Sequence, residues 1–429
     1  MRAMSGHMAL AVIFAAVGPA QTLETHRSEL APETLLLAKI KVRASENLEK
    51  LPNYTCLETI ERSRRPASSR RFQLIDVVRL EVAFVNNKEL FAWPGSDHFE
   101  DRDITDLVSG GAIGNGSFAL HARGVFLSRS PGYTFVGERI RDGRATIRFD
   151  YRVPMFMSGY RIRVKPLEGI VGYEGSFWVD ATSLDLVRLE VRVTEVPPHL
   201  PITSGTETLE YRRQRIGEGD FLLPHSSEMV LTDLRGNESH NRISFSACRQ
   251  YAGESVLSFA DAPEGSVEEK KPPRRIEIPA GVDLDLRLDT DVETGKSAVG
   301  DALQATVMRD AKQKGQVVVP KGAVVSGRLV KLQYAGAERQ PRWIAGLEFS
   351  KIEFENTVAP FHARMSPVTP IGSFGLTGST GPLVEARLRE QPPENPWIGI
   401  LYLRGERGRI PAGTRLTWRT GTPSIEEQK

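Results

Sequence analysis

The stretch GIVGYEGSFWVDATSLDLVRLEVRVTEV, from Gly169 to Val196, decides the fold. Its second half alternates apolar with polar residues, a period of two that is typical of an antiparallel strand covered on one side only. The apolar set is Val187, Leu189, Val191 and Val193. Its first half places Tyr173, Phe177 and Val179 on one face, so the stretch predicts a β-hairpin turning at residues 180–183. A lone hairpin cannot bury its apolar face, and the neighbouring chain must supply more sheet and a cover.

Length and charge bound the class of protein. A chain of 429 residues favours two domains. The 56 basic and 54 acidic residues nearly cancel, so composition gives no indication of nucleic-acid binding. No internal apolar run reaches the roughly 18 residues that span a bilayer, and we expect a protein that is not membrane-spanning.

The N-terminus has the layout of a secretory signal peptide. Arg2 precedes the apolar run MALAVIFAAV, and Gly18-Pro-Ala20 ends in a small residue. We therefore expect residues 1–20 to be removed, with cleavage near Ala20, and the protein to be periplasmic or secreted. The alternative is a short buried segment, which Pro19 and the polar residues after it disfavour.

Residues 30–255 predict the first domain. Pro32 to Leu51 has apolar residues at three- and four-residue spacing, which predicts one amphipathic helix as the cover of a sheet. About ten antiparallel strands should follow. They include separate strands at Phe221–Leu223 and Ser227–Asp233, and short helices are expected around residues 104–108 and 118–126 within the irregular insertion 95–128.

The charged, Pro-containing residues 256–275 predict a linker, and residues 276–422 a second domain. The second domain repeats a turn that feeds a strand, at Ile278-Pro-Ala-Gly281, Val319-Pro-Lys-Gly322 and Ile410-Pro-Ala-Gly413. Short alternating strands between these turns favour a small β-barrel or sandwich. The predicted fold class is thus mainly β.

Cys56 and Cys248 are the only cysteines. Both lie on strand-like stretches near the two ends of the first domain, and export would put them in an oxidising compartment. We expect a disulfide between them; two buried free thiols that never meet are the alternative.

Known catalytic and metal-binding motifs are missing from the sequence. The eight histidines show no H-x-H or H-E-x-x-H spacing, and there is no G-x-S-x-G or phosphate-binding loop. We therefore expect no enzyme activity, no metal site and no cofactor. The basic run Glu61-Arg-Ser-Arg-Arg65 with Arg70 and Arg71 favours a solvated hairpin loop over contact with anionic lipid headgroups.

The motif Gly175-Ser-Phe-Trp-Val-Asp180 followed by Leu186-Val-Arg-Leu-Glu190 resembles a hairpin of the periplasmic outer-membrane lipoprotein carriers and of the related lipoprotein-binding sensor. This resemblance implies a strongly curved antiparallel sheet, a half-barrel, closed on one side by helices and holding acyl chains on an apolar concave face. Tyr54-Thr-Cys56 and Cys248-Arg249 are also similar to a group of exported bacterial proteins of unassigned activity. The cysteine pair and the insertion 95–128 depart from the carrier pattern.

The second domain resembles the β-barrel of conjugation and type IV secretion scaffolds. The shared residues are Ile278-Pro-Ala-Gly281, Val299-Gly-Asp301, Ala305-Thr-Val307 and Val319 to Gly327. The resemblance implies a small barrel fold; the chain does not have the long helical segments of those scaffolds, and no pore role is implied.

The candidate ligand-binding residues are those expected on the concave face of the first domain: Phe149, Tyr151, Ile162, Phe177, Val179, Leu189 and Val191. If the helix covers them they are ordinary core, and if the sheet leaves a gap they can bury an acyl chain. The first hypothesis is a non-catalytic envelope protein that binds a lipid, another hydrophobic ligand or an acylated protein there. The second is an envelope scaffold or sensor with both cores filled, and a hydrolase whose site is assembled from distant residues is the remote third.

Overall fold

The computed structural model describes most of the chain outside the predicted signal peptide and linker. The described residues are 31–86, 88–96, 99, 104–106, 112–114, 120–127, 132–164, 166–251, 274–335, 342–366, 384–385 and 395–422. The expected cleavage near Ala20 and nearly all of the linker 256–275 lie outside them.

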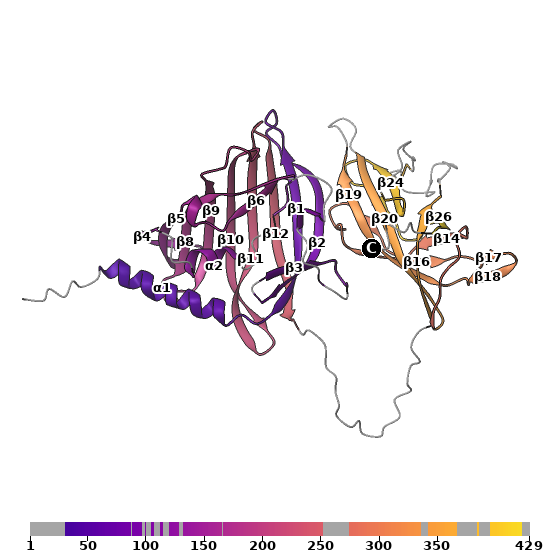
Figure 1. Ribbon diagram of the computed structural model, residues 1–429, viewed down its shortest axis with the longest axis horizontal. Coiled ribbons are helices and arrows are strands. Elements are labelled where there is room, and N and C mark those ends of the chain that lie inside the picture. The colour runs from indigo at the N-terminus through magenta and orange to yellow at the C-terminus, as the bar shows by residue number, and fades with distance from the viewer. Residues whose placement is uncertain are drawn as a thin grey trace, which may run out of the picture.

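The N-terminal domain is one ten-stranded antiparallel sheet that curls into a half-barrel (Figure 1). Its strand order is β3-β2-β1-β12-β11-β10-β9-β8-β5-β4, so nearly every neighbour in space is also a neighbour in sequence. The strands are β1 (Tyr54–Arg65), β2 (Gln73–Val85), β3 (Lys88–Ala92), β4 (Gly132–Arg141), β5 (Arg144–Val153), β8 (Gly172–Asp180), β9 (Leu186–Thr194), β10 (Ile202–Ile216), β11 (Gly219–Asp233) and β12 (Glu238–Gln250). This architecture confirms the predicted fold class.

Three short elements cover the inner face of the half-barrel. Helix α1 (Pro32–Glu49) has Pro in its first turn and buries Ile40 and Ala44 against the sheet. Helix α2 (Leu120–Phe126) packs beside it on the same core. The hairpin of β6 (Arg161–Val164) and β7 (Leu167–Ile170) packs on the inner face nearer the opposite end of the strands. The predicted helix therefore supplies only part of the cover.

Two strand predictions were wrong in detail because bulges were not visible in the sequence. Strand β11 runs unbroken through Pro224, where a register shift at Glu210/Tyr211 accommodates the missing N–H. A second shift, between Trp178 and Val179, makes Leu186 rather than Val187 the inward-facing residue at the start of β9. Of the helix expected at 104–108, the structure describes residues 104–106, which form the 3₁₀ turn η1 (Ile104–Asp106).

The disulfide between Cys56 and Cys248 is present and joins neighbouring strands β1 and β12. The β1–β12 register shifts between Thr55 and Leu57, so β12 carries an extra residue there. Ala247 absorbs it with a left-handed φ of 48°, which places Cys248 opposite Cys56. The predicted pairing is confirmed, and a bulge supplies its geometry.

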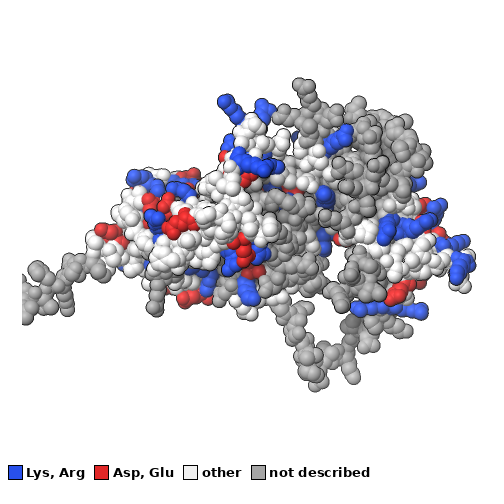
Figure 2. Space-filling model, turned by 45° about the horizontal axis from the view of Figure 1, so that its top comes forward, with Lys and Arg blue, Asp and Glu red and all other residues white. Residues whose placement is uncertain are grey.

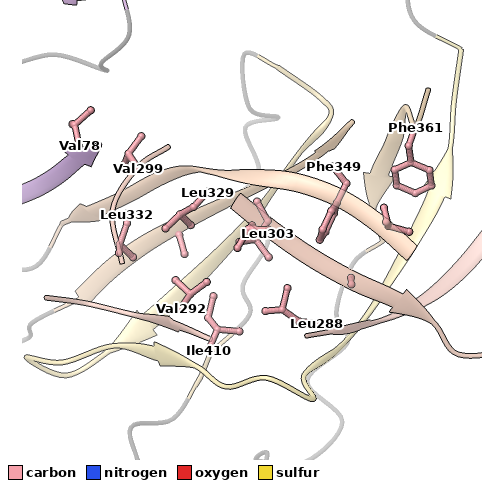
Figure 3. Packing of buried hydrophobic residues seen from close by; sticks show 14 of the residues in the cluster. Val78, Leu288, Val292, Val299, Leu303, Leu329, Leu332, Phe349, Phe361 and Ile410 are labelled. Atoms are coloured by element: carbon pink, nitrogen blue, oxygen red, sulfur yellow. The ribbon is translucent and has the colours of Figure 1, made fainter. Parts of the chain in front are cut away.

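The C-terminal domain is a second, mainly antiparallel sheet whose core is continuous with the buried side chains of β1, β2 and β12. Its main strand order is β13-β21-β20-β19-β16-β14-β26-β22, with β24 beside β20 and only β13–β21 parallel. The strands are β13 (Arg274–Arg275), β14 (Asp283–Leu288), β15 (Val292–Glu293), β16 (Ala302–Val307), β17 (Ala311–Gln313), β18 (Gln316–Val319), β19 (Val324–Tyr334), β20 (Arg342–Phe354), β21 (Thr357–Pro360), β22 (Ala363–Met365), β23 (Val384–Glu385), β24 (Ile398–Arg404), β25 (Arg409–Ile410) and β26 (Arg415–Thr420). Figure 3 shows buried side chains of this core, among them Leu288, Leu303, Leu329 and Phe349.

The two domains join at the free edge of β2. Strand β3 pairs only with residues 81–85 of β2, which leaves residues 77–79 without a partner on that side. Val299 fills this place: its carbonyl accepts from the Arg79 N–H at 2.8 Å, and its N–H donates to Val77 at 2.8 Å. The Arg79 guanidinium forms an ion pair with Asp301, and the side chains of Val78 and Val299 lie together (Figure 3).

Removing the disulfide should lower the free energy of unfolding by about 5 kcal/mol in the chain-entropy model, because 192 residues separate the two cysteines. Urea titrations of the oxidised and reduced protein measure this difference. The double variant Cys56→Ser/Cys248→Ser serves as the control, because a reductant should not change its midpoint. Equal midpoints for oxidised and reduced wild type would contradict a stabilising role.

Gly300→Ala should separate the domains. An added Cβ at Gly300 would lie 2.3 Å from the Arg79 carbonyl oxygen and 2.8 Å from the Trp93 ring. Gly295→Ala is the matched control, because Gly295 shares the positive φ but has nothing within 4 Å of its added Cβ. Small-angle scattering should show a larger radius of gyration for Gly300→Ala alone; unchanged scattering would mean that this contact does not hold the domains together.

Candidate functional site

Six of the seven candidate ligand-binding residues lie together on the inner face of the half-barrel. Phe177 of β8 lies opposite Phe149 of β5 on one side and Leu189 of β9 on the other. Val179 lies opposite Ile147, and Tyr151 and Val191 lie on either side of Gly175. All six are at most 3% exposed. They pack against Phe126 of α2 and Ile40 of α1, so the helices cover them as a core.

The seventh residue, Ile162, lies on a covering element instead of on the sheet. It is part of the β6–β7 hairpin and packs in a separate cluster with Val171, Val193, Leu200 and Ile202. Val193 lies on the inner face of β9, the same face as Leu189 and Val191. Ile162 therefore packs apart from the other six and does not extend their row.

Polar side chains divide the inner face into two apolar parts. One apolar cluster lies over β5, β8, β9 and β10, and the other over β1, β2 and β12. Between them Glu207 accepts from Ser227 Oγ at 2.9 Å and contacts His121 Nε2 of α2 at 2.9 Å. These three side chains are each at most 6% exposed. The sequence predicted a uniformly apolar concave face. The structure shows instead that polar side chains interrupt it.

A buried ion pair lies further along the same face. Arg62 of β1 donates from Nε to Asp76 Oδ1 at 2.7 Å and from Nη2 to the second carboxylate oxygen. Arg62 is 1% exposed. Bidentate geometry with charge-assisted bonds is what makes such burial tolerable. The sequence predicted a solvated loop for the basic run Glu61-Arg-Ser-Arg-Arg65. This prediction is wrong for Arg62, because Arg62 lies two residues after Ile60 on β1 and its side chain points to the same inner face.

Glu58 is the most unusual group on the inner face. It is fully buried, and its cross-strand neighbours are Leu80 on β2 and Phe245 on β12. Neither carboxylate oxygen has a hydrogen-bond partner among the residues that the structure describes. Burial raises the pKa of Glu58 well above its ordinary value, and the negative charges of Glu89 and Glu207 raise it further. A carboxyl group in this environment favours a protonated state or a donor brought by a ligand.

The hydroxyl of Tyr211 is a second unused polar group in this region. Among the described residues it has no hydrogen-bond partner, and the Tyr211 side chain belongs to the cluster under the helices. Burial, followed by the charge of Glu207, raises the pKa of Tyr211. Glu58 and Tyr211 therefore give the inner face a carboxyl group and a hydroxyl group that are both without a hydrogen-bond partner among the described residues.

Sequence reasoning missed these buried polar groups, although a signal was present. In YTCLETIER, Glu58 and Arg62 share the even-numbered positions of Tyr54, Cys56 and Ile60, which are the inward ones. A charged residue in register with an apolar face marks either a register error or a buried polar site. Glu207 and His121 could not have been paired, because 86 residues separate them.

One end of helix α1 is fixed to the sheet by Asp185, in the turn between β8 and β9. Asp185 accepts from Arg43 and Asn47 of α1 and from Arg213 of β10, at 2.7 to 3.1 Å. Burial alone raises the pKa of Asp185, but bonds from Arg213 and Asn47 and the nearby arginine charges outweigh it and hold the pKa below its ordinary value. The network fixes the position of α1 over the sheet.

Two hollows lie on the other, convex face. One, of about 280 Å³, is lined by Arg148, Asp150 and Ser176 on neighbouring strands. A larger one, of about 530 Å³, lies between the half-barrel and residues 295–297 of the C-terminal domain, with Arg79, Arg242 and Glu228 in its wall. The first is mainly polar and includes Tyr151 of the predicted residues in its wall, whereas the second is lined by charged, polar and apolar side chains and contains none of them.

Metal ligation and membrane crossing have no support in the described part of the chain. Within it no three His, Cys, Asp or Glu side chains come close enough to hold a metal ion. Among the helices described, none combines the length and the hydropathy needed to traverse a bilayer.

Comparisons with known proteins bear on the N-terminal domain. No family model matches the chain, and no curated protein matches it. Solved structures with a similar fold include a DUF1329 family protein from Desulfovibrio piger (13% identity, TM-score 0.25) and a putative outer membrane lipoprotein-sorting protein domain from Vibrio parahaemolyticus (12%, 0.26). A LolA superfamily protein from Nitrosomonas europaea is a third (10%, 0.25).

These matches cover 50–52% of this chain and 94% of each solved chain. At this identity and these TM-scores the likeness says nothing of function, and the resemblance of the C-terminal domain stays a prediction.

Glu58→Gln should remove a pH dependence of stability. The raised pKa means that the folded protein keeps the Glu58 proton at pH values above 4.5, where the unfolded chain has lost it. The free energy of unfolding therefore falls as pH rises through the folded-state pKa of Glu58. At pH 8 the variant should be more stable than wild type by about 1–3 kcal/mol, the cost of an unsatisfied buried charged group. Urea titrations at pH 5 and pH 8 test this.

Glu61→Gln is the control, because Glu61 lies three residues along β1 with a half-exposed side chain. A pH profile that is the same for wild type and Glu58→Gln would show that Glu58 ionises as an ordinary carboxyl.

Proposed function

We propose that the protein is an exported, non-catalytic component of the bacterial cell envelope whose N-terminal half-barrel binds a hydrophobic ligand under its covering helices. The ligand is a lipid or the acyl chain of an acylated protein. The observation that carries the proposal is the fully buried carboxyl of Glu58, which lies among apolar side chains of the inner face and has no hydrogen-bond partner in the described part of the chain.

An amphiphile fits both kinds of surface found there. Its hydrocarbon part would lie against the apolar rows that include Phe149, Phe177 and Leu189, at about 0.8 kcal/mol for each buried CH₂ group. Its head group would bring a hydrogen-bond donor to Glu58 or Tyr211. A purely apolar ligand would bring no hydrogen-bond partner to Glu58 or Tyr211. The site therefore favours a ligand with a hydroxyl, amide or amine group near its acyl chain.

Entry requires the cover to move, because the apolar residues are buried beneath it. The cover consists of separate short pieces: a seven-residue helix, a hairpin of four-residue strands and helix α1. Helix α1 forms no backbone ladder with the sheet and is fixed by Asp185 and a few apolar contacts. Such elements open at lower free energy than strands inside the sheet.

A scaffold or sensor is the second candidate function. It is favoured by the close packing of the six candidate residues, including Phe149 and Phe177 stacked at 5.5 Å between ring centroids. The hollow between the domains, with Arg79, Arg242 and Glu228 in its wall, also suits a protein surface better than an acyl chain. In this function both cores are filled and Glu58 is a protonated core residue.

Native mass spectrometry of the protein purified from its own envelope without detergent distinguishes the two. The binding function predicts a mass increment that disappears on organic extraction and is identified as a lipid or acyl species. A chain at its own mass, retained by a partner protein, would support the scaffold instead.

Asp185→Ala should ease opening of the cover. Loss of the charge-assisted hydrogen bonds to α1, worth about 1.5–3 kcal/mol, should raise the open population and the rate of fluorescent fatty-acid uptake by about tenfold or more. Asp220→Ala is the matched control, because Asp220 also accepts from Arg213 but forms no hydrogen bond or ion pair with the described residues of α1. Equal uptake by Asp185→Ala and Asp220→Ala, or no uptake by any form, would contradict a ligand site under α1.

A further inference from the structure

Four loops meet at one end of the half-barrel strands. They connect β1 to β2, β5 to β8, β9 to β10 and β11 to β12, and antiparallel pairing brings all four to the edge that is uppermost in Figure 1. We call this edge the upper rim and define it by residues 64–72, 152–170, 195–201 and 233–238, without residue 165, which the structure does not describe.

Large exposed hydrophobic side chains gather on the upper rim. Phe156 is 81% exposed and Leu234 is 66% exposed. Seven of the fourteen large hydrophobic residues found exposed among the described residues lie here: Phe72, Met155, Phe156, Met157, Leu167, Ile170 and Leu234. Single exposed hydrophobics are ordinary on a protein surface, but a group gathered on one edge marks an interaction site.

The same rim is strongly basic. Its described residues include eight arginines and four carboxylates, whereas the whole chain has a net charge of only +2. The arginines are Arg64, Arg65, Arg70, Arg71, Arg152, Arg161, Arg163 and Arg235, and the acids are Asp233, Glu168, Glu195 and Glu238. Figure 2 turns this end toward the viewer and shows blue side chains projecting from it.

Several of these charges are free for a partner. Glu238 forms an ion pair with Arg65, Glu195 with Arg152, and Glu168 with both Arg161 and Arg163. Asp233 accepts from the backbone of its own turn at Arg235 and Asn237. Arg70, Arg71 and Arg235 form no ion pair with any described residue, and all three are exposed.

Two of the loops are held together. The Ala67 N–H donates to Asn237 Oδ1 at 3.2 Å, which joins the β1–β2 turn to the β11–β12 turn. Phe72 lies between the guanidinium of Arg65, 5.0 Å from its ring centroid, and the ring of His240. These contacts hold two loops of the upper rim together and place a guanidinium group beside the exposed ring of Phe72.

We propose that the upper rim docks onto the surface of an anionic lipid bilayer, with the arginines against phosphate groups and Phe156, Leu234 and their neighbours in the interfacial layer. Charge complementarity selects this partner, because surplus positive charge beside exposed apolar side chains is the combination that an anionic membrane surface attracts. Docking of this edge is a separate property from ligand binding under the helices, and either can hold without the other.

The test is co-sedimentation of the full chain with phosphatidylcholine vesicles, with and without phosphatidylglycerol. The protein should sediment with the anionic vesicles and be released by salt. At about fivefold per arginine, Arg70→Gln/Arg71→Gln should reduce partitioning about 25-fold. Phe156→Ser should reduce it about tenfold by removing apolar surface from the interface.

Matched controls lie at the other end of the strands. Ile140 is 82% exposed beside the β4–β5 turn, and Arg144 and Arg215 lie at the β4–β5 and β10–β11 ends. Ile140→Ser and Arg144→Gln/Arg215→Gln should sediment like wild type. Failure of wild type to bind anionic vesicles, or equal losses in rim and control variants, would overturn the proposal, whatever ligand the half-barrel holds.

Discussion

The structure depends on one constraint: a single curled sheet has an inner face that must be filled, and alternation along ten strands commits every second side chain to it. Neighbouring strands are joined mostly by short turns, so the sheet is assembled from local pairings. The exception is the contact of β1 with β12, which brings together the two ends of the domain. Pairing and the Cys56–Cys248 disulfide both fix that contact.

The inner face is filled in an uneven way, and this unevenness is what suggests a function. Under α1 and α2 the side chains form an aromatic core. Toward β1 the same face carries Glu58, Glu207 and the Arg62–Asp76 pair. Buried polar groups destabilise a fold unless they are satisfied, so a protein that retains an unsatisfied one has a use for it or keeps it neutral. A donor brought by an amphiphilic ligand accounts for Glu58 together with its apolar neighbours.

The sequence predicted those features that follow from local alternation. The hairpin from Gly172 to Thr194, the mainly β class and the disulfide could be obtained from periodicity and cysteine position, and they are confirmed. Bulges could not, because Pro224 and the Trp178/Val179 shift change inward parity without a change in composition. The cover could be predicted only in part: the helix at Pro32 to Leu51 and the short helix around 118–126 are confirmed as α1 and α2, but that α2 and β6–β7 pack on the inner face depends on contacts distant in sequence. The candidate apolar residues were placed together, while the polar groups between them were missed.

The most direct test of a ligand site at Glu58 is a measurement of the pKa of its side chain. Carbon-13 NMR of the Glu58 carboxyl gives this pKa in protein without added ligand and in protein loaded with a fatty-acid amide. A donor placed on the carboxylate by the ligand should lower the raised pKa, because a hydrogen bond to the charged form favours ionisation. A pKa that stays where it is when the protein is loaded, or a protein that cannot be loaded, would contradict a ligand site at Glu58.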